Sequence, residues 1–225
     1  MLKYDLHMHT HYSKCSSLKP ETMLKLAKKY KLDGIAVTDH HEIMGALEVK
    51  KLNKDKNFEV IVGEEISTNY GDVLVYYLSK KIDETDFFAA IDEARKQNAL
   101  VVLPHPFRTT LVHNHKFKLP LEKVKNKIDA LECFNARTLP GDNKKANDAA
   151  DKLKMAKTAG SDSHFFFEVG TAYSIFDGDL RSAIKRKKID VDGTIMFGAL
   201  GGVLSYLKKY VISEKMSYPI IISLR

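Results

Sequence analysis

The sequence predicts an α/β fold, built either as a barrel or as a doubly wound sheet, in which parallel strands alternate with helices. Three observations predict this class. Short runs of Val, Ile and Leu recur along the chain, amphipathic helical patterns lie between them, and histidines and acids gather where the runs end. In both architectures the active site lies at the carboxyl ends of the strands. We therefore expect these histidines and acids to share one site.

The predicted strands are short apolar runs whose length and composition suit strands buried on both faces of a parallel sheet. Polar residues that could carry chemistry follow each of them. In chain order, the runs are residues 2–6 before His7, 34–38 before Asp39 and His40, 58–63 before Glu64 and Glu65, 99–103 before His105, 129–134 before Asn135, and 157–160 before Asp162 and His164.

The predicted helices occupy the segments between these runs. Residues 20–30 place Met23 and Ala27 on one face, and a proline and a glutamate mark the beginning of the segment. Residues 86–97 and 143–155 have alanine-rich inner faces and charged outer faces. Each helix can therefore cover the sheet with its apolar side.

The nine histidines lie in four short clusters, three of which adjoin acids at the ends of apolar runs. Neutral imidazole and carboxylate groups are the ligands of zinc, manganese and iron in proteins. Alternation along a strand places His7 and His9 on the same face, where both can bind one ion. A lone histidine in a polar loop, such as His113 or His115, is more typical of the surface. The pattern as a whole predicts a multinuclear metal centre.

Five segments, taken together and in this order, resemble the motifs of the polymerase and histidinol phosphatase (PHP) superfamily. They are DLHMHT at 5–10, TDH at 38–40, GEEIST at 63–68, HPF at 105–107 and GSDSH at 160–164. The resemblance covers residues 1–178. It implies a distorted (βα)7 barrel that holds two or three divalent metal ions, either Zn, Mn or Fe, and hydrolyses phosphate esters.

Carried over position by position, the resemblance implies three ion sites that share ligands. The first ion would bind His7, His9, Glu65 and Asp162; Glu65 would bridge to a second ion, which also binds His105; and His40 and His164 would bind a third. Ions held this close together can activate a water molecule and neutralise both oxygens of a phosphoryl displacement. Glu65 and Asp162 are therefore also expected among the catalytic residues.

Two positions depart from the family pattern. Cys15 stands where related sequences often carry an aspartate ligand; its thiolate would suit zinc and would bind manganese or magnesium poorly. Alternatively, Cys15 is a small buried side chain and no ligand. Some members also carry a histidine a dozen or so residues after the bridging glutamate, where this chain reads Val75-Tyr76-Tyr77. The second ion would then complete its coordination with water.

Three further residues are candidates for catalysis or substrate binding. Asp39 is predicted either to orient a ligand imidazole, as carboxylates beside metal-binding histidines do, or to cap the following helix. Arg108 and Arg137 are predicted to bind the substrate phosphate, because a guanidinium group matches phosphate oxygens bidentately. The alternative for both arginines is an ordinary place on the surface.

Length and composition indicate one catalytic domain with a tail. With 225 residues, 44% hydrophobic and 29% charged, the chain can bury a large core. We expect residues 1–190 to form the barrel. Residues 191–225 are expected to pack on it or to form a subunit interface, as in a homodimer. The apolar stretch 194–207 is shorter than a membrane span requires, so no membrane contact is expected.

Cysteine usage and the beginning of the chain bear on location. Cys15 and Cys133 are far apart in the sequence, which suggests reduced thiols and no disulfide framework. The first predicted strand begins at once and leaves no room for a signal peptide. We therefore expect a cytoplasmic protein.

The net charge of +7 fits an anionic substrate without choosing its size. Hydrolysis of a small phosphorylated metabolite or nucleotide is the favoured function. A nuclease or exonuclease with the same metal chemistry is the alternative, and it would need a groove that contacts several phosphates. A non-catalytic metal-binding regulatory module and a structural protein with incidental histidines are two further alternatives.

Overall fold

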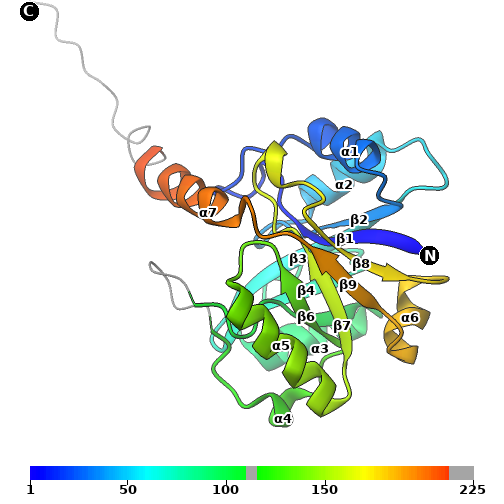
Figure 1. Ribbon diagram of the computed structural model, residues 1–225, viewed down its shortest axis with the longest axis vertical. Helices are drawn as coiled ribbons and strands as arrows, with labels where there is room; N and C mark the ends of the chain where they lie inside the picture. Colours follow the sequence, from blue (N-terminus) through cyan, green and yellow to red (C-terminus); the bar gives the residue numbers. More distant parts are fainter. Residues whose placement is uncertain (110–115, 213–225) are drawn as a thin grey trace, which may run out of the picture.

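The computed structural model describes residues 1–109 and 116–212, whose strands form one sheet that curls into a nearly closed barrel (Figure 1). The barrel prediction is therefore confirmed. The strands follow the order β7-β6-β5-β4-β3-β2-β1-β8-β9. They are β1 (Leu2–Met8), β2 (Gly34–Val37), β3 (Glu59–Thr68), β4 (Gly71–Tyr76), β5 (Leu100–Leu103), β6 (Ala130–Asn135), β7 (Ala156–Gly160), β8 (Ala172–Phe176) and β9 (Asp190–Gly193).

The strands run in two parallel groups joined by an antiparallel strand. Strands β1, β2 and β3 are parallel, as are β5, β6 and β7, whereas β4 is antiparallel to both β3 and β5. Strand β8 is antiparallel to β1, and β9 to β8. The segment after β7 meets the end of β1, where the Asp162 N–H donates to the His7 carbonyl at 2.7 Å and the His9 N–H donates to the Ser163 carbonyl at 2.9 Å. These two hydrogen bonds join the β7 side of the barrel to β1.

The region from β3 to β4 differs from its sequence-based prediction. The expected strand 58–63 continues as far as Thr68, so Glu65 lies inside β3 and does not follow it. A turn of two residues, Asn69 and Tyr70, leads directly into β4, and Gly71 has a φ of 130°. No helix separates β3 from β4, so the β–α alternation that predicted β1, β2, β3, β5, β6 and β7 gives no signal for β4.

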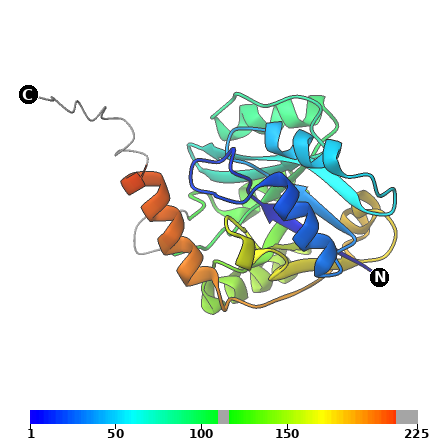
Figure 2. The ribbon, with the colours of Figure 1, turned by 90° about the horizontal axis from the view of Figure 1, so that it is seen from above.

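Helices cover the outside of the barrel, as the view from above shows (Figure 2). The predicted helices at 20–30, 86–97 and 143–155 are present as α1, α3 and α5. Asp86 caps α3 by accepting from two backbone N–H groups, and a proline occupies the first turn of α5. The helices are α1 (Pro20–Lys29), α2 (Met44–Leu52), α3 (Phe87–Lys96), α4 (Leu121–Val124), α5 (Pro140–Leu153), α6 (Leu180–Arg186) and α7 (Gly198–Tyr206), with a 3-10 helix η1 (Phe166–Glu168) and a π-helix η2 (Leu207–Ile212).

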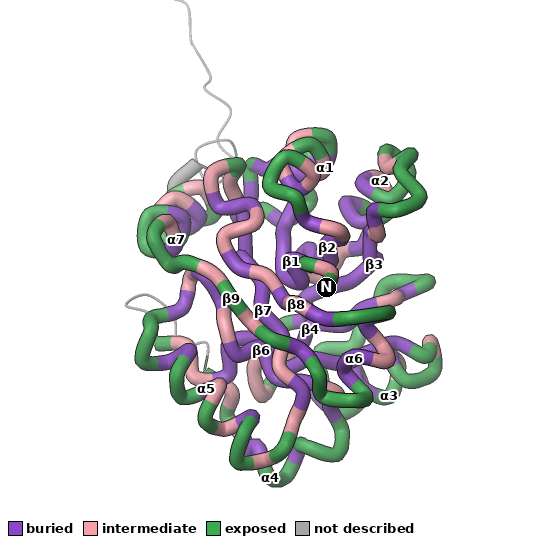
Figure 3. The backbone as a smooth tube through the Cα atoms, turned by 45° about the vertical axis from the view of Figure 1, so that its right-hand side comes forward, coloured by how far each residue is buried: buried purple, intermediate pink, exposed green. Residues whose placement is uncertain are grey.

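Two apolar clusters stabilise the barrel from its two sides. The larger joins the outer faces of the strands to the inner faces of α1, α2, α3, α4 and α5. The smaller fills the inside of the barrel with residues such as Leu6, Ile61 and Val102, and α6 packs against it beside residues at the beginnings of strands. Figure 3 shows the buried strands at the centre and exposed positions along the outer helices. With one end of the barrel filled, polar side chains collect at the other end.

The C-terminal part of the described chain packs against the barrel through β9 and α7. Strand β9 extends the sheet beside β8, and α7 follows it on the side of the loops after β6 and β7 (Figure 1). A Cβ atom at Gly198 would collide with the backbone of Ala136 and Arg137, and one at Gly201 with the side chains of Glu168 and Arg137, so glycine permits this close approach. Among the described helices, none has the length and apolarity needed to cross a membrane. Residues 213–225, the last part of the segment expected to pack on the barrel or at a subunit interface, lie outside the described residues.

Candidate metal centre

The structure brings the predicted ligands together at the carboxyl ends of the strands. They come from segments far apart in the chain, and most of their side chains are buried. His7 and His9 belong to the end of β1, His40 follows β2, Glu65 lies in β3, His105 follows β5, and Asp162 and His164 follow β7.

A β-bulge helps to direct both imidazoles of the His7-Met8-His9 segment toward the centre. The pairing of β1 with β2 shifts register between Asp5 and Met8. Leu6 packs inside the barrel, whereas Met8 packs in the outer cluster with the helices. The extra residue of a bulge changes which face the following side chains occupy. His7 therefore joins His9 at the inside end of the barrel, although Leu6 also points inward.

Glu65 occupies the middle of the cluster and contacts four histidines. Its Oε2 atom lies 3.4 Å from Nε2 of His7, 3.3 Å from Nε2 of His9 and 3.1 Å from Nδ1 of His40. Its Oε1 atom lies 3.2 Å from Nε2 of His105. The two oxygens of one carboxylate thus face different imidazoles, which is the arrangement that a bridging metal ligand requires.

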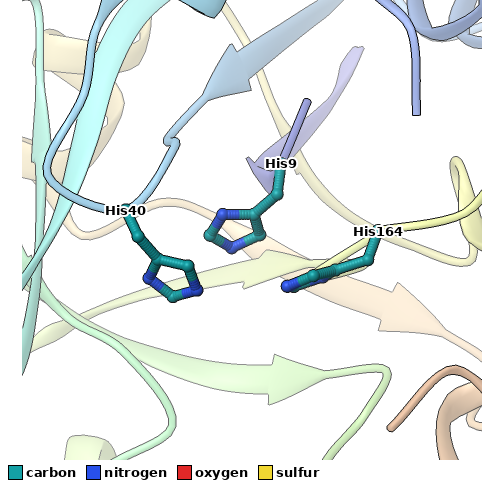
Figure 4. A group of neighbouring side chains, drawn as sticks. All are labelled: His9, His40 and His164. Atoms are coloured by element: carbon teal, nitrogen blue, oxygen red, sulfur yellow. The ribbon is translucent and has the colours of Figure 1, made fainter. Parts of the chain in front are cut away.

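The potential ligand atoms fall into overlapping groups in which all atoms lie within 4.8 Å of one another. One group contains only imidazoles, and Figure 4 shows its three rings turned toward one another. The ring of His9 has its centre 4.5 Å from that of His40 and 4.3 Å from that of His164. Within the described residues, the groups are His9 with His40 and His164, His7 with His105 and Asp162, His7 with His9 and Glu65, and Glu65 with Asp72 and His105.

Two buried nitrogen atoms indicate that this donor set fits metal ions. Nε2 of His7 and Nε2 of His9 are both buried, and neither has a hydrogen-bond partner in residues 1–109 or 116–212. They lie 3.3–3.8 Å from carboxylate oxygens of Glu65 and Asp162, but without hydrogen-bond geometry. Buried polar atoms are normally satisfied, so exceptions require an explanation. Divalent ions between these nitrogens and carboxylates would satisfy both.

The pKa shifts in the cluster favour the ligand forms of several groups. Burial opposes ionisation of Glu65, but His40 and His7 outweigh it and hold the pKa of Glu65 well below its usual value. The pKa of Asp162 is likewise held low against burial, by His7 and Arg108. Burial lowers the pKa of His40 to about 4 and moves that of His164 well below its ordinary range. At neutral pH these carboxylates are charged and these two imidazoles are neutral, as metal binding requires. The pKa values of His7 and His9 are instead raised against burial by the neighbouring carboxylates, so a metal ion bound there would displace protons.

The backbone is strained at two of the predicted ligands. His105 has a φ of 29° and Asp162 a φ of 53°, in a region that residues other than glycine rarely adopt. Such strain persists only where the surrounding contacts fix it, and it is common at functional sites. Here the Asp162 N–H is fixed by the His7 carbonyl, and the His105 N–H donates to Glu132 at 2.9 Å.

Glu132 supports the centre and was not anticipated from the sequence. Its Oε1 atom lies 2.9 Å from Nδ1 of His7, and its Oε2 atom accepts from the His105 N–H and from the Asn135 amide at 3.0 Å. A carboxylate that holds one imidazole nitrogen fixes the tautomer and leaves the other nitrogen for the metal. The available signal was a single acid inside the apolar run of β6.

Asp39 is buried and organises the loop after β1. It accepts from the backbone N–H of Thr10 at 2.7 Å, from the Thr10 hydroxyl at 2.6 Å and from the Ser13 hydroxyl at 2.6 Å. Ser13 in turn accepts from the His40 N–H at 3.0 Å. Asp39 directly precedes His40 in the chain and contacts the loop that follows His9. It therefore positions the two segments that carry these predicted ligands.

The two candidate arginines have different surroundings. Nη1 of Arg108 donates to Asp162 at 2.8 Å, so this guanidinium borders the centre, and its buried Nε atom has no hydrogen-bond partner among the residues that the structure describes. Arg137 is almost fully buried and binds both oxygens of Glu168 at 2.7 Å, with Ser205 of α7 as a third partner at 3.0 Å. Glu168 accepts from the His164 N–H. Arg137 thus supports the His164 loop and helix α7.

Cys15 lies close to the centre but outside the groups of neighbouring ligand atoms formed by the described residues. Burial raises the pKa of its thiol to about 12. The thiol form is a poor metal ligand. The geometry therefore favours the interpretation of Cys15 as a small buried side chain.

Comparison with known proteins identifies the family. The model of the PHP domain matches residues 5–172, three quarters of the chain and all of the metal centre. The chain belongs to the PHP domain family. An uncharacterized protein of Methanocaldococcus jannaschii is 37% identical over 182 residues, which cover 78% of this chain and 70% of that protein.

Solved structures share the fold of this PHP domain. A two-domain protein from Bacteroides vulgatus, described as containing a predicted PHP-like metal-dependent phosphoesterase, matches with a TM-score of 0.73 at 18% identity. The match covers 86% of this chain and 65% of that protein, so this chain spans less than two thirds of it. PsfC from Pseudomonas syringae matches with a TM-score of 0.67 at 20% identity, covering 92% of this chain and 97% of PsfC.

Proposed function

We propose that this PHP domain hydrolyses phosphate esters of small phosphorylated metabolites or nucleotides at a centre of two or three divalent ions. The observation that carries the proposal is the position of Glu65, whose two carboxylate oxygens face four imidazoles. A carboxylate in this position can be shared by adjacent ions. Membership of the PHP domain family supports the same chemistry. One structural relative is described as containing a predicted PHP-like metal-dependent phosphoesterase.

The ions would be held by ligands that the structure brings together, and zinc, manganese and iron all suit imidazole and carboxylate donors. Bound ions of this kind lower the pKa of a coordinated water and neutralise phosphate oxygens. The proposed ligands are His7, His9, His40, Glu65, His105, Asp162 and His164.

Arg108 is proposed to bind the substrate phosphate. Its guanidinium already contacts the Asp162 carboxylate at 2.8 Å, and its buried Nε–H has no acceptor within the described part of the chain. Planar guanidinium donors match the oxygens of phosphate in the same way as those of a carboxylate. Among the described residues, Arg108 is the arginine paired with a ligand carboxylate, because Arg137 is bound to Glu168.

His164 has a defined role in this arrangement. Its Nδ1 atom lies 2.8 Å from the Asp162 carbonyl, which can only accept, so this nitrogen carries the proton. The lone pair is then on Nε2, the nitrogen that Figure 4 shows directed toward the other two rings. The backbone of Asp162 thereby sets the tautomer that a metal ligand needs.

A substrate screen with metal-reconstituted protein tests the proposal. Chelator-stripped protein would be reloaded separately with Zn²⁺, Mn²⁺ and Fe²⁺ and assayed with p-nitrophenyl phosphate, bis-p-nitrophenyl phosphate, nucleotides and short oligonucleotides. We expect monoester or nucleotide hydrolysis that vanishes with chelator, and that is lost in Asp162→Asn but kept in the exposed control Asp92→Asn.

The outcomes separate the alternatives. Preferential cleavage of oligonucleotides would replace the small substrate by a nuclease function. Metal binding without hydrolysis of any ester would favour a non-catalytic metal-binding module. Activity that persists in Asp162→Asn would contradict the ligand assignment.

A further inference from the structure

The antiparallel direction of β4 brings an additional acid to the metal centre. In the β3–β4 hairpin, Ser67 pairs with Asp72 and Glu65 pairs with Leu74. Directly paired residues lie on the same face of a sheet, and so do residues two apart along a strand. Asp72 therefore shares a face with Glu65. Because β4 runs opposite to β3, its first residues lie at the edge where the parallel strands end.

The side chain of Asp72 reaches the ligand cluster from this position. One of its carboxylate oxygens lies within 4.8 Å of ligand atoms of both Glu65 and His105, and these three form one of the possible metal-binding groups. On the side of Glu65 that faces His105, the Oε1 atom of Glu65 lies 3.2 Å from Nε2 of His105. Asp72 is half-buried, so it lies between the metal centre and the solvent.

We propose that Asp72 is a ligand of the second metal ion, which it binds together with Glu65 and His105. This inference rests on the proposed metal centre and adds a residue that the sequence motifs do not contain. It fills the place for which the family pattern offers a histidine in some members and this chain reads Val75-Tyr76-Tyr77. With Asp72 the second ion has three protein ligands. Without it, the ion would have two protein ligands and would complete its coordination with water.

The added carboxylate gives the two ends of the centre different chemistry. We call the group of Glu65, Asp72 and His105 the carboxylate end, and the group of His9, His40 and His164 the imidazole end. Carboxylate ligands suit harder ions such as Mn²⁺ and Mg²⁺, whereas imidazole suits Zn²⁺ and Fe²⁺. The carboxylate end is therefore selective for Mn²⁺ over Zn²⁺ relative to the imidazole end.

Metal titration of Asp72 variants tests the proposal without an activity assay. Chelator-stripped wild type, Asp72→Asn, Asp72→His and the exposed control Asp92→Asn would be titrated with Mn²⁺ by calorimetry. Free Mn²⁺ would be followed by electron paramagnetic resonance. Loss of one Mn²⁺ per chain, or weakening of one site by roughly a hundredfold or more, is expected for Asp72→Asn, because even indirect partners of a metal contribute 10- to 100-fold. The control should match the wild type.

The histidine variant distinguishes loss of a ligand from loss of structure. Asp72→His restores a donor at the same position, so it should regain the ion count with a preference moved toward Zn²⁺. Wild-type Mn²⁺ number and affinity in Asp72→Asn would overturn the inference, as would a wild-type metal preference in Asp72→His. A wild type that binds Mn²⁺ as expected but hydrolyses no ester would overturn the proposed function alone. A wild type that binds no Mn²⁺ would overturn the inference about Asp72, and one that binds none of Zn²⁺, Mn²⁺ and Fe²⁺ would overturn the proposed function as well.

Discussion

The two ends of the metal centre are built from different parts of the barrel. The imidazole end takes its residues from the segments at the ends of β1, β2 and β7, all of which run in the parallel sense. The carboxylate end depends on the β3–β4 hairpin, where an antiparallel strand returns to the same edge. Strand direction, in addition to the order of motifs, therefore decides which potential ligands come together.

Glu65 connects the two ends. Its Oε2 atom faces His40 at 3.1 Å and its Oε1 atom faces His105 at 3.2 Å. Each end also has its own support: Glu132 fixes the backbone of His105 together with the ring of His7, whereas Glu168 fixes the backbone of His164. Variants at these positions should therefore affect one end, the other end or both.

Glu65→Gln should have the largest effect, because it replaces the shared carboxylate with a neutral amide. We expect ions to be lost from both ends and ester hydrolysis to fall to background. Elemental analysis after dialysis against Zn²⁺ and Mn²⁺ measures the first effect, and Glu122→Gln at an exposed ion pair is the matched control. A full ion count in Glu65→Gln would refute the bridging role.

Arg137→Met should affect mainly stability and the imidazole end. The variant leaves Glu168 buried without its partner, which costs about 3–5 kcal/mol of unfolding free energy. Urea denaturation measures this loss. Because Glu168 also holds the His164 N–H, Zn²⁺ binding should weaken while Mn²⁺ binding at the carboxylate end persists. Unchanged stability together with a raised KM would instead support the phosphate-binding role that the sequence suggested.

Glu132→Gln should have an intermediate effect. An amide keeps one acceptor oxygen, so it cannot satisfy both His7 Nδ1 and the His105 N–H as the carboxylate does. Loss of such support lowers metal affinity by about 10- to 100-fold. Calorimetric titration with Mn²⁺ tests this, and an affinity equal to wild type would show that Glu132 does not position the ligands.

Cys15→Ser should have the smallest effect. The thiol is buried with a pKa raised to about 12, so below that pH it stays protonated and is no thiolate ligand. We expect an unchanged ion count, and slow reaction of native Cys15 with a thiol reagent at pH 8 that becomes fast in urea. Loss of one Zn²⁺ in Cys15→Ser would make Cys15 a fourth ligand of the imidazole end.

Much of the fold was predictable because its parallel part follows simple rules. The apolar runs before His7, His40 and His105 and the helical patterns between them specify alternating strands and helices. Strand β4 was not predicted, because it follows β3 through a two-residue turn and no helical pattern separates the two strands. Strands β8 and β9 were not predicted because each contains a single Val or Ile residue.

The motifs point to the ligands that the structure brings together, whereas the supporting residues depend on tertiary contacts. The position of Asp72 requires the hairpin register, which no motif encodes. Glu132 acts through His7, 125 residues away in the chain. Arg137 resembles a phosphate-binding arginine in sequence, but the fold places Glu168 against it.

Anomalous X-ray diffraction from crystals soaked with both Zn²⁺ and Mn²⁺ tests the central claim most directly, because data collected at each absorption edge identify each ion. The account predicts one ion bonded to His9, His40 and His164 and another bonded to Glu65, Asp72 and His105, with a higher ratio of Mn²⁺ to Zn²⁺ at the second ion than at the first. The absence of ions bonded to Glu65, or an equal ratio of Mn²⁺ to Zn²⁺ at both ends, would contradict it.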